Sequence, residues 1–153
     1  MDNPFKVRLA TQEDIDKIVR LAEEWHDGAI DCKIRKETLK ETLSKEGHEI
    51  FVAIKDEKII GWFDIRAYLD WFLLRYSVHV EHIFVTSAYC KKGVGSLILA
   101  KIMEHYRKLG EQSNMLVMFF YSEGIVDRFF TKNRFTITRQ HFFVRKELIN
   151  RKQ

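Results

Sequence analysis

Cysteine is scarce in this chain, and its thiols form no recognisable framework. Cys32 and Cys90 are the only cysteines among 153 residues. Two cysteines are too few for a disulfide scaffold, and this pair lacks the close spacing of metal ligands. We therefore expect free thiols and no metal site.

Long hydrophobic runs are missing as well. No apolar stretch reaches the roughly 18 residues that a membrane-spanning helix needs. Residues 1–7 lack the basic and then apolar pattern of a secretory signal peptide. Internal repeats, low-complexity tracts and interdomain linkers are not visible either. These absences predict a cytoplasmic protein with no membrane partner.

The composition is that of one folded domain. A chain of 153 residues with 46% hydrophobic and 31% charged residues is long enough for a real core. The net charge is +4, but Lys and Arg are scattered among nearly as many acidic residues, as on a solvated surface. No nucleic-acid partner is therefore expected. A nucleic-acid-binding α/β domain, with steeply salt-dependent affinity, stays open as an alternative.

The first part of the chain predicts a strand and two helices. Residues 5–10 alternate like a short strand. Thr11 with the acidic residues after it is typical of a helix start. A second helix covers residues 35–46 and ends near Gly47. One face of the first helix carries Ile15, Ile18, Val19, Ala22 and Trp25.

A predicted hairpin follows these helices. Residues 50–55 and 59–69 read as its strands, joined by a tight turn at residues 56–58. Residues 71–76 form a hydrophobic linker to which the pattern assigns no structure.

The chain is organised around residues 80–109. Residues 80–85 alternate and carry β-branched and aromatic side chains, which predicts a strand. A helix follows, because apolar residues recur three and four positions apart, and Gly110 provides its stop. The apolar positions of this helix are Val94, Leu97, Ile98, Ile102, Tyr106 and Leu109.

The last part predicts a strand over residues 115–121, a helix over residues 124–132 and a strand pair at residues 135–137 and 140–146. The complete order is β-α-α-β-β-β-α-β-α-β-β. This alternation predicts an α/β or α+β fold with a mixed sheet and helices on both faces.

The loop before the central helix has the features of a phosphate cradle. It ends in G-V-G-S at residues 93–96, at a helix N-terminus whose backbone N–H groups and dipole favour an anion. The glycines let a ligand approach the backbone, and Lys91 and Lys92 add positive charge. A lone Gly-x-Gly is a weak signal, because neither the dinucleotide fingerprint nor a P-loop is present.

The residues around this loop resemble a family motif. V-E-H-I-F-V at residues 80–85, followed by A-Y-C-K-K-G-V-G-S at residues 88–96, resembles the acetyl-CoA motif of the GNAT superfamily of N-acetyltransferases. Residues 8–14 resemble the opening of such domains, and the element order is similar over nearly the whole chain. The resemblance implies one N-acetyltransferase domain over residues 1–153, with a mixed and mostly antiparallel central sheet.

The resemblance also implies acetyl-CoA as cosubstrate and an amine as acceptor. The pyrophosphate would lie on the backbone of residues 92–96, and the pantetheine arm along residues 83–85. A backbone N–H of Phe84 or Val85 would form an oxyanion hole, and the amine would attack directly. The cofactor-binding residues expected on this basis are Ile83, Phe84, Val85, Cys90, Lys91, Lys92, Gly93, Val94, Gly95, Ser96 and Phe130.

A general base is the more valuable helper in such a reaction. Deprotonating an amine with a pKa of about 10.4 costs roughly 4 to 5 kcal/mol at pH 7, whereas expelling a thiolate with a pKa of about 8.5 costs about 2 kcal/mol. The resemblance implies that Glu81 is the base, acting through a water molecule. His79 shares its strand face by the two-residue period and is the alternative base. His82 is expected to point the other way.

The chain departs from the family pattern at several positions, which include Glu123 in place of an Asn and Arg134 in place of a Gly. Residues 129–135 read F-F-T-K-N-R-F, so Phe130 stands where the family has the Tyr that acts as general acid. Phe130 can pack against the cofactor but cannot donate a proton; Tyr121, or water, would substitute. Cys90 replaces the usual Arg or Gln. These departures motivate an alternative, a GNAT-like CoA-binding protein with weak or no catalysis.

The acceptor is expected between the first two helices and the last hairpin. There Glu24, Asp27 and Asp31 would attract a cationic amine, either a small molecule such as a polyamine or a peptide or protein amine. Exposed strands or the apolar residues 71–74 would provide a surface for a homodimer.

Overall fold

The computed structural model of the chain shows two compact units, residues 1–119 and residues 120–153. No helix in the described part of the chain is long and apolar enough to cross a membrane. The residues that the structure describes are 4–25, 32–72, 74–107, 114–117 and 125–135.

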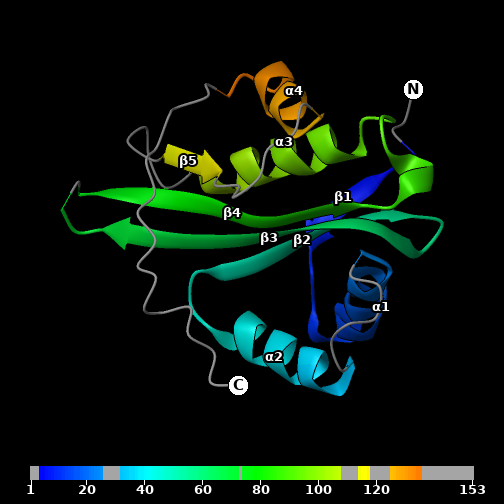
Figure 1. Cartoon of the computed structure of the whole chain (residues 1–153). Coiled ribbons are helices and arrows are strands. Elements are labelled where there is room, and N and C mark those ends of the chain that lie inside the picture. Colours follow the sequence, from blue (N-terminus) through cyan, green and yellow to red (C-terminus); the bar gives the residue numbers. More distant parts are fainter. Residues whose placement is uncertain (1–3, 26–31, 73, 108–113, 118–124, 136–153) are drawn as a thin grey trace, which may run out of the picture. The chain divides into compact units, whose positions relative to one another are not determined.

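A five-stranded sheet forms the centre of the first unit (Figure 1). Its strands lie in chain order, and neighbouring strands are antiparallel except for the fourth and fifth, which are parallel. The predicted mixed and mostly antiparallel sheet is confirmed. The strands are β1 (Lys6–Leu9), β2 (His48–Lys55), β3 (Lys58–Asp70), β4 (Arg75–Val85) and β5 (Asn114–Val117).

Helices cover both faces of this sheet, as predicted. α1 (Ile15–Trp25) and α2 (Cys32–Ser44) lie on one face, and α3 (Val94–Tyr106) lies on the other (Figure 1). The predicted apolar faces are buried at Ile15, Ile18, Val19 and Ala22 of α1 and at Val94, Ile98, Ile102 and Tyr106 of α3, as their helical spacing predicts. The Trp25 side chain lies outside the described residues. On α3, Leu99 is fully buried and Leu97 is only half-buried, so the buried stripe differs from the predicted one at this position.

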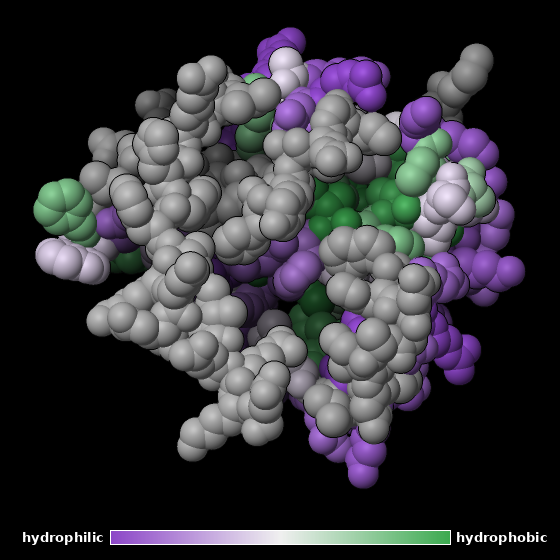
Figure 2. Space-filling model, in the orientation of Figure 1, coloured by the Kyte–Doolittle hydropathy of each residue, from purple (hydrophilic) through white to green (hydrophobic). Residues whose placement is uncertain are grey.

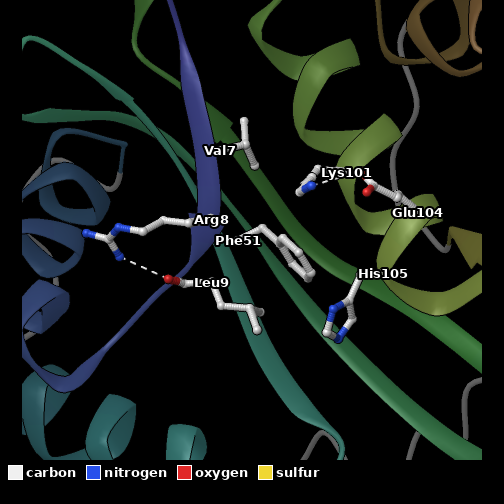
Figure 3. Close-up of a pocket in the computed structure, with 7 residues that line it drawn as sticks. All are labelled: Val7, Arg8, Leu9, Phe51, Lys101, Glu104 and His105. Atoms are coloured by element: carbon white, nitrogen blue, oxygen red, sulfur yellow. Dashed lines mark hydrogen bonds and ion pairs between the residues drawn. The ribbon is translucent and has the colours of Figure 1, made fainter. Parts of the chain in front are cut away.

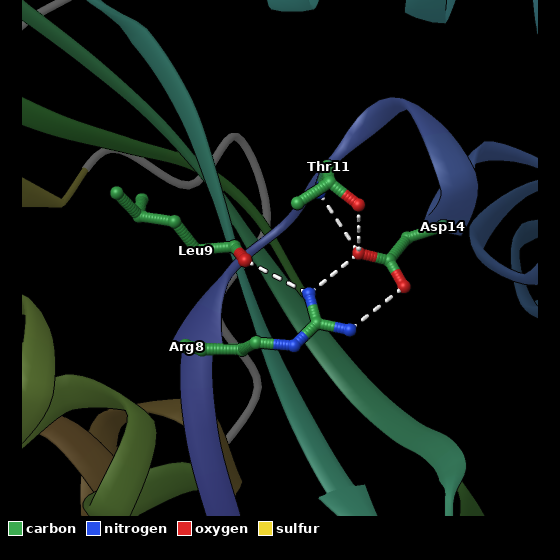
Figure 4. Close-up of polar contacts among 4 residues, drawn as sticks. All are labelled: Arg8, Leu9, Thr11 and Asp14. Atoms are coloured by element: carbon green, nitrogen blue, oxygen red, sulfur yellow. Dashed lines mark hydrogen bonds and ion pairs between the residues drawn. The ribbon is translucent and has the colours of Figure 1, made fainter.

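The predicted start of the first helix is confirmed. A 3-10 turn (Gln12–Asp14) precedes α1. The backbone N–H of Thr11 donates to the Asp14 carboxylate at 2.8 Å, and the Asp14 N–H donates to the Thr11 carbonyl at 3.0 Å. Arg8 of β1 binds the same carboxylate through both terminal nitrogens, at 2.6 and 3.0 Å (Figure 4). These contacts, the Arg8 hydrogen bonds first, lower the pKa of Asp14 to about 2 although the side chain is buried.

The predicted hairpin is present as β2 and β3, with positive φ angles at Asp56 and Glu57 in its turn. The stretch 71–76, predicted as a linker, belongs to a second hairpin, because β3 extends to Asp70 and β4 begins at Arg75. The tip of this hairpin, at the left of Figure 2, exposes Leu69, Trp71, Phe72 and Leu74.

The second unit contains α4 (Ile125–Lys132), where a short helix was predicted. Phe130 packs edge-to-face on Phe129 and on Phe135, with ring centroids 4.9 and 5.2 Å apart. The strand pair predicted after Phe135 lies outside the described residues.

Candidate active site

A β-bulge interrupts the pairing of β3 and β4 at Glu81. Asp64 lies opposite His82, but the next residue of β3, Ile65, lies opposite Val80. Glu81 is therefore the extra residue of β4. A bulge shifts the two-residue alternation by one position, so residues on its two sides no longer follow the sequence pattern.

Three pairs of polar side chains cross from β3 to β4 around this bulge. The β3 members are two residues apart and therefore share one face of the sheet. Their β4 partners must lie on that same face, and we call the six side chains the polar row. The pairs are Asp64 Oδ2 with His82 Nδ1 at 3.0 Å, Arg66 Nη2 with Glu81 Oε1 at 2.8 Å, and Tyr68 Oη with His79 Nε2 at 3.1 Å.

This arrangement confirms that His79 and Glu81 share a face, but the prediction that His82 points the other way is wrong. A strict two-residue period would place the side chains of His82 and Glu81 on opposite faces of the sheet. The bulge brings both side chains to one side, where His82 reaches Asp64.

The polar row lies on the face that α1 and α2 cover. Trp62, two residues before Asp64 on β3, belongs to a buried cluster with Ile18 and Ala22 of α1. Its indole ring lies 6.2 Å from the His82 ring and 6.4 Å from the Phe84 ring. The two rings of β4 therefore border the core beneath α1.

The two histidines of the row have opposite environments. His79 is only 7% exposed, and burial is the main reason that its pKa lies below the usual value. The nearby Arg66 lowers it further, against the opposing effect of Glu81. The His82 side chain is 52% exposed, and its hydrogen bond with Asp64 is the main reason that its pKa lies above the usual value.

Glu81, predicted as the base, is an ion-pair partner in the structure. Its side chain is 30% exposed, and Oε1 has the contact with Arg66 but no aligned hydrogen bond. The carboxylate therefore faces a full positive charge. Whether Glu81 is the base stays a prediction.

Buried polar atoms without a hydrogen-bond partner gather at the polar row. Among the described residues, five side chains have such an atom, and four of them belong to this part of β3 and β4. The fifth, Arg35, comes from α2, which covers the same face. Unsatisfied buried polar groups are rare and point to a ligand or to water. The four atoms are Trp62 Nε1, Asp64 Oδ1, His79 Nδ1 and Glu81 Oε1.

The other edge of β4 lacks a strand partner from Glu81 onwards in the described part of the chain. The pairing of β4 with β5 ends at Val80 and Val117. We call this edge of residues 81–85 the open edge. The Thr86 N–H donates toward β3, to the Ile60 carbonyl at 2.9 Å. By alternation, the Val85 N–H points toward the open edge, which selects Val85 over Phe84 for the predicted oxyanion contact.

The predicted phosphate cradle lies where the open edge ends. Gly93 precedes α3 with a φ of 84°, in the left-handed region that favours glycine, and a side chain there would meet no atom within 4 Å. The Leu97 N–H donates to the Gly93 carbonyl at 3.0 Å. The N–H groups of Val94 and Gly95 come before this first bond of α3, so no carbonyl four residues earlier in the helix accepts from them.

Two lysines and a cysteine surround the cradle. The Lys92 and Lys55 ammonium groups each lie 5.4 Å from the centre of the Tyr89 ring, within cation–π range. Lys91, with a φ of 62°, is exposed. Cys90 is an exposed free thiol whose Sγ donates to the Val85 carbonyl at 3.4 Å, so it links the cradle to the open edge.

Several predicted site residues are not part of the polar row or the cradle. Tyr121, Asp27 and Asp31 lie outside the described residues. Phe130 belongs to the second unit, and Glu24 is an exposed residue of α1. Conversely, Asp64, Arg66 and Tyr68 were not predicted, although their two-residue spacing on the strand before Glu81 marks one polar face.

A cleft of about 450 Å³ lies elsewhere, between β1, β2 and α3 (Figure 3). The charged groups lining it already have partners. Lys101 pairs with Glu104 at 2.8 Å, Arg8 pairs with Asp14, and His105 lies 3.1 Å from Glu49, which also accepts a hydrogen bond from Tyr106. With its charges neutralised, this cleft is a weaker candidate than the polar row.

Among the described residues, no group of three or more His, Cys, Asp or Glu side chains could hold a metal ion.

A sequence model of the acetyltransferase (GNAT) family matches residues 13–122, more than half of the chain. A comparison with curated proteins finds none that matches.

Solved structures share the fold at low sequence identity. An aminoglycoside acetyltransferase from an uncultured soil metagenomic sample, in complex with sisomicin, is 18% identical with a TM-score of 0.72, over 94% of this chain and 97% of that one. An acetyltransferase from Trypanosoma brucei is 14% identical with a TM-score of 0.76, over 92% and 99%. A transcriptional regulator from Bacillus halodurans C-125 is 17% identical with a TM-score of 0.77, over 92% and 99%.

Proposed function

Because the chain belongs to the acetyltransferase (GNAT) family, we propose that it is an N-acetyltransferase that moves the acetyl group of acetyl-CoA to a primary amine. The observation that carries this proposal is the open edge of β4, which runs from the bulge at Glu81 to the loop before α3. One end of the edge offers groups that can transfer protons, and the other end offers a site for an anion.

The cradle residues fit the pyrophosphate of acetyl-CoA. The N–H groups at the start of α3 point out of the helix end, and the helix dipole favours negative charge there. The open space beside Gly93 gives a ligand access to the backbone. The exposed Lys91 and Lys92 add positive charge. Because the Val94 side chain is buried, this residue would contribute its backbone N–H alone.

The open edge fits the pantetheine arm and the thioester. Residues 83–85 would pair with the amides of the arm as an added strand does, since their outer backbone groups have no strand partner in the described part of the chain. The Val85 N–H would then face the thioester carbonyl and stabilise the negative charge that develops on its oxygen. The Cys90 thiol, bonded to the Val85 carbonyl, would hold this end of the edge in place.

The acceptor amine would attack the thioester from the face that carries the polar row. As the C–N bond forms and the C–S bond breaks, an ammonium acceptor loses two protons. One proton ends on the thiol of CoA, and the other passes to solvent. Proton-accepting groups within reach of the thioester are therefore required, and the polar row supplies Glu81, His79 and His82 next to residues 83–85.

The chemistry of the polar row favours a cationic acceptor. Asp64 Oδ1 is a buried oxygen without a hydrogen-bond partner, and an ammonium group would provide a donor for it. The aminoglycoside acetyltransferase of similar fold was solved with sisomicin, which motivates including aminoglycosides among the amines to be tested. Cytoplasmic location and homodimer formation stay predictions.

The proposal is tested by following thiol release from acetyl-CoA with the purified full chain and a panel of amines. The panel should contain polyamines, lysine, peptide N-termini and aminoglycosides, with acetyl-CoA alone as the control for hydrolysis. Release that depends on one class of amine, with an acetylated product of the expected mass, supports the proposal. Tight binding of acetyl-CoA without release from any amine would favour the alternative of a CoA-binding protein without catalysis, which Phe130 and Cys90 motivate.

A further inference from the structure

The polar row places three groups that can accept a proton beside the proposed thioester position, and their environments differ. We propose that His82, oriented by Asp64, is the catalytic base that takes the proton of the acceptor amine. This inference rests on the proposed function and assigns to His82 the role that the family resemblance implied for Glu81.

The Asp64 contact prepares His82 for this role. Oδ2 of Asp64 lies 3.0 Å from Nδ1 of His82. A carboxylate can only accept, so in the neutral imidazole Nδ1 carries the hydrogen and the lone pair lies on Nε2. This tautomer is inferred from the partner. The contact also holds the ring at a fixed orientation while half of the side chain stays accessible.

The other two groups are less suited to accept the proton. His79 is almost fully buried, and burial disfavours its protonated form. Glu81 lies 2.8 Å from Arg66, and protonating it would break an ion pair. Only His82 combines accessibility with a carboxylate partner that stabilises its protonated form.

Two polar atoms near His82 could bind the acceptor. Trp62 Nε1 and Asp64 Oδ1 are buried and lack a hydrogen-bond partner, and the Trp62 ring lies 6.2 Å from the His82 ring. Trp62 Nε1 is a hydrogen-bond donor and Asp64 Oδ1 is an acceptor. A water molecule, or a bound amine that also carries a hydroxyl group, would satisfy both atoms. His82 also directly precedes Ile83, the first residue of the proposed pantetheine contact.

Both protons that the ammonium group loses have a destination. Nε2 of His82 takes one proton from the ammonium group, which leaves a neutral amine with a lone pair. The amine nitrogen bonds to the acetyl carbon, the C–S bond breaks, and the sulfur leaves as thiolate. The second proton of the nitrogen reaches this sulfur, and His82 returns its own proton to solvent.

The pH dependence of the rate follows from the charged groups around His82. Asp64 on β3 and Glu81 on β4 both raise the pKa of His82, with the Asp64 hydrogen bond as the largest cause. A base must be neutral to act, so the rate should rise with pH through an inflection above the ordinary histidine value of about 6.5. Removing the Asp64 charge should move this inflection to lower pH.

The experiment compares His82→Gln and Asp64→Asn with the wild type by thiol release, using the amine on which the wild type is most active. We expect His82→Gln to lower kcat by about 10²- to 10⁴-fold with unchanged acetyl-CoA affinity. We expect Asp64→Asn to retain the inflection but shift it to lower pH.

Further variants serve as controls. The inflection should persist in Glu81→Gln, and added imidazole should restore part of the rate of His82→Ala. His105→Gln is a matched control, because His105 also pairs with a carboxylate but lies on α3.

The outcomes separate this inference from the proposed function. If the wild type releases thiol and His82→Gln retains its rate and pH profile, His82 is not the base, and the inference fails alone. If Glu81→Gln loses the rate and the inflection while His82→Gln keeps both, the base is Glu81. If the wild type releases no thiol with any amine, the proposed function fails, and the inference fails with it.

Discussion

Arg66 Nη2 lies 2.8 Å from Glu81 Oε1, at the bulge that interrupts the pairing of β3 and β4. The pair therefore places one positive and one negative charge beside the buried His79. Arg66 lowers the pKa of His79 and Glu81 raises it, while burial has the largest effect.

Replacing Arg66 with Met should raise the pKa of His79, because a positive charge that opposes its protonation is removed. Glu81→Gln should lower it. Both shifts can be measured by following the ring protons of His79 by NMR as a function of pH. The ring of His105 provides an internal reference on the other side of the sheet. A fall in the His79 pKa in Arg66→Met would contradict this electrostatic description.

Asp14 should make the folded state sensitive to acid. Its pKa is about 2 in the folded protein against 3.8 for an ordinary Asp, a difference that corresponds to about 2 kcal/mol. Because the folded pKa is the lower one, this stabilisation is present above pH 4 and is lost as the pH falls toward 2. Asp14→Asn should unfold at lower urea concentration at pH 7.

The matched control for this prediction is Asp16→Asn. Asp16 forms an exposed ion pair with Lys36 at 2.9 Å, and such pairs contribute little to stability because solvent screens the charges. Urea unfolding at pH 7 and pH 3 should show that Asp14→Asn loses less stability on acidification than the wild type does. An equal loss in both proteins would show that Asp14 is not the group responsible.

Lys91 and Lys92 should contribute to the affinity for acetyl-CoA through charge. Replacing both with Ala should weaken binding and reduce its dependence on salt, since fewer cations then face the phosphates. Replacing Lys101, near the middle of α3 and paired with Glu104, should change neither. Isothermal titration at low and high salt measures both quantities. Equal salt dependence in wild type and the double variant would contradict the placement of the phosphates at this loop.

Much of the fold could be predicted from local patterns. The helical spacing of Ile15, Ile18 and Val19 and the capping residue Thr11 are signals within one element, and the structure confirms them. The Gly-x-Gly at the start of α3 is also a local signal, and Gly93 has a positive φ, in the left-handed region that favours glycine.

The site depends on pairing between strands, which sequence patterns do not show. The bulge at Glu81 arises from the register of β4 against β3, and it decides that His82 faces Asp64. A single strand read with a two-residue period cannot reveal an extra residue. The extension of β4 back to Arg75 was missed for a similar reason, because its partner residues lie on β3.

Titration of the purified full chain with acetyl-CoA tests the central claim most directly, because the cradle and the open edge of β4 are proposed to bind this molecule. We predict saturable binding of one acetyl-CoA per chain, weakened by high salt and by replacement of Lys91 and Lys92. The absence of saturable binding at millimolar acetyl-CoA would contradict the account.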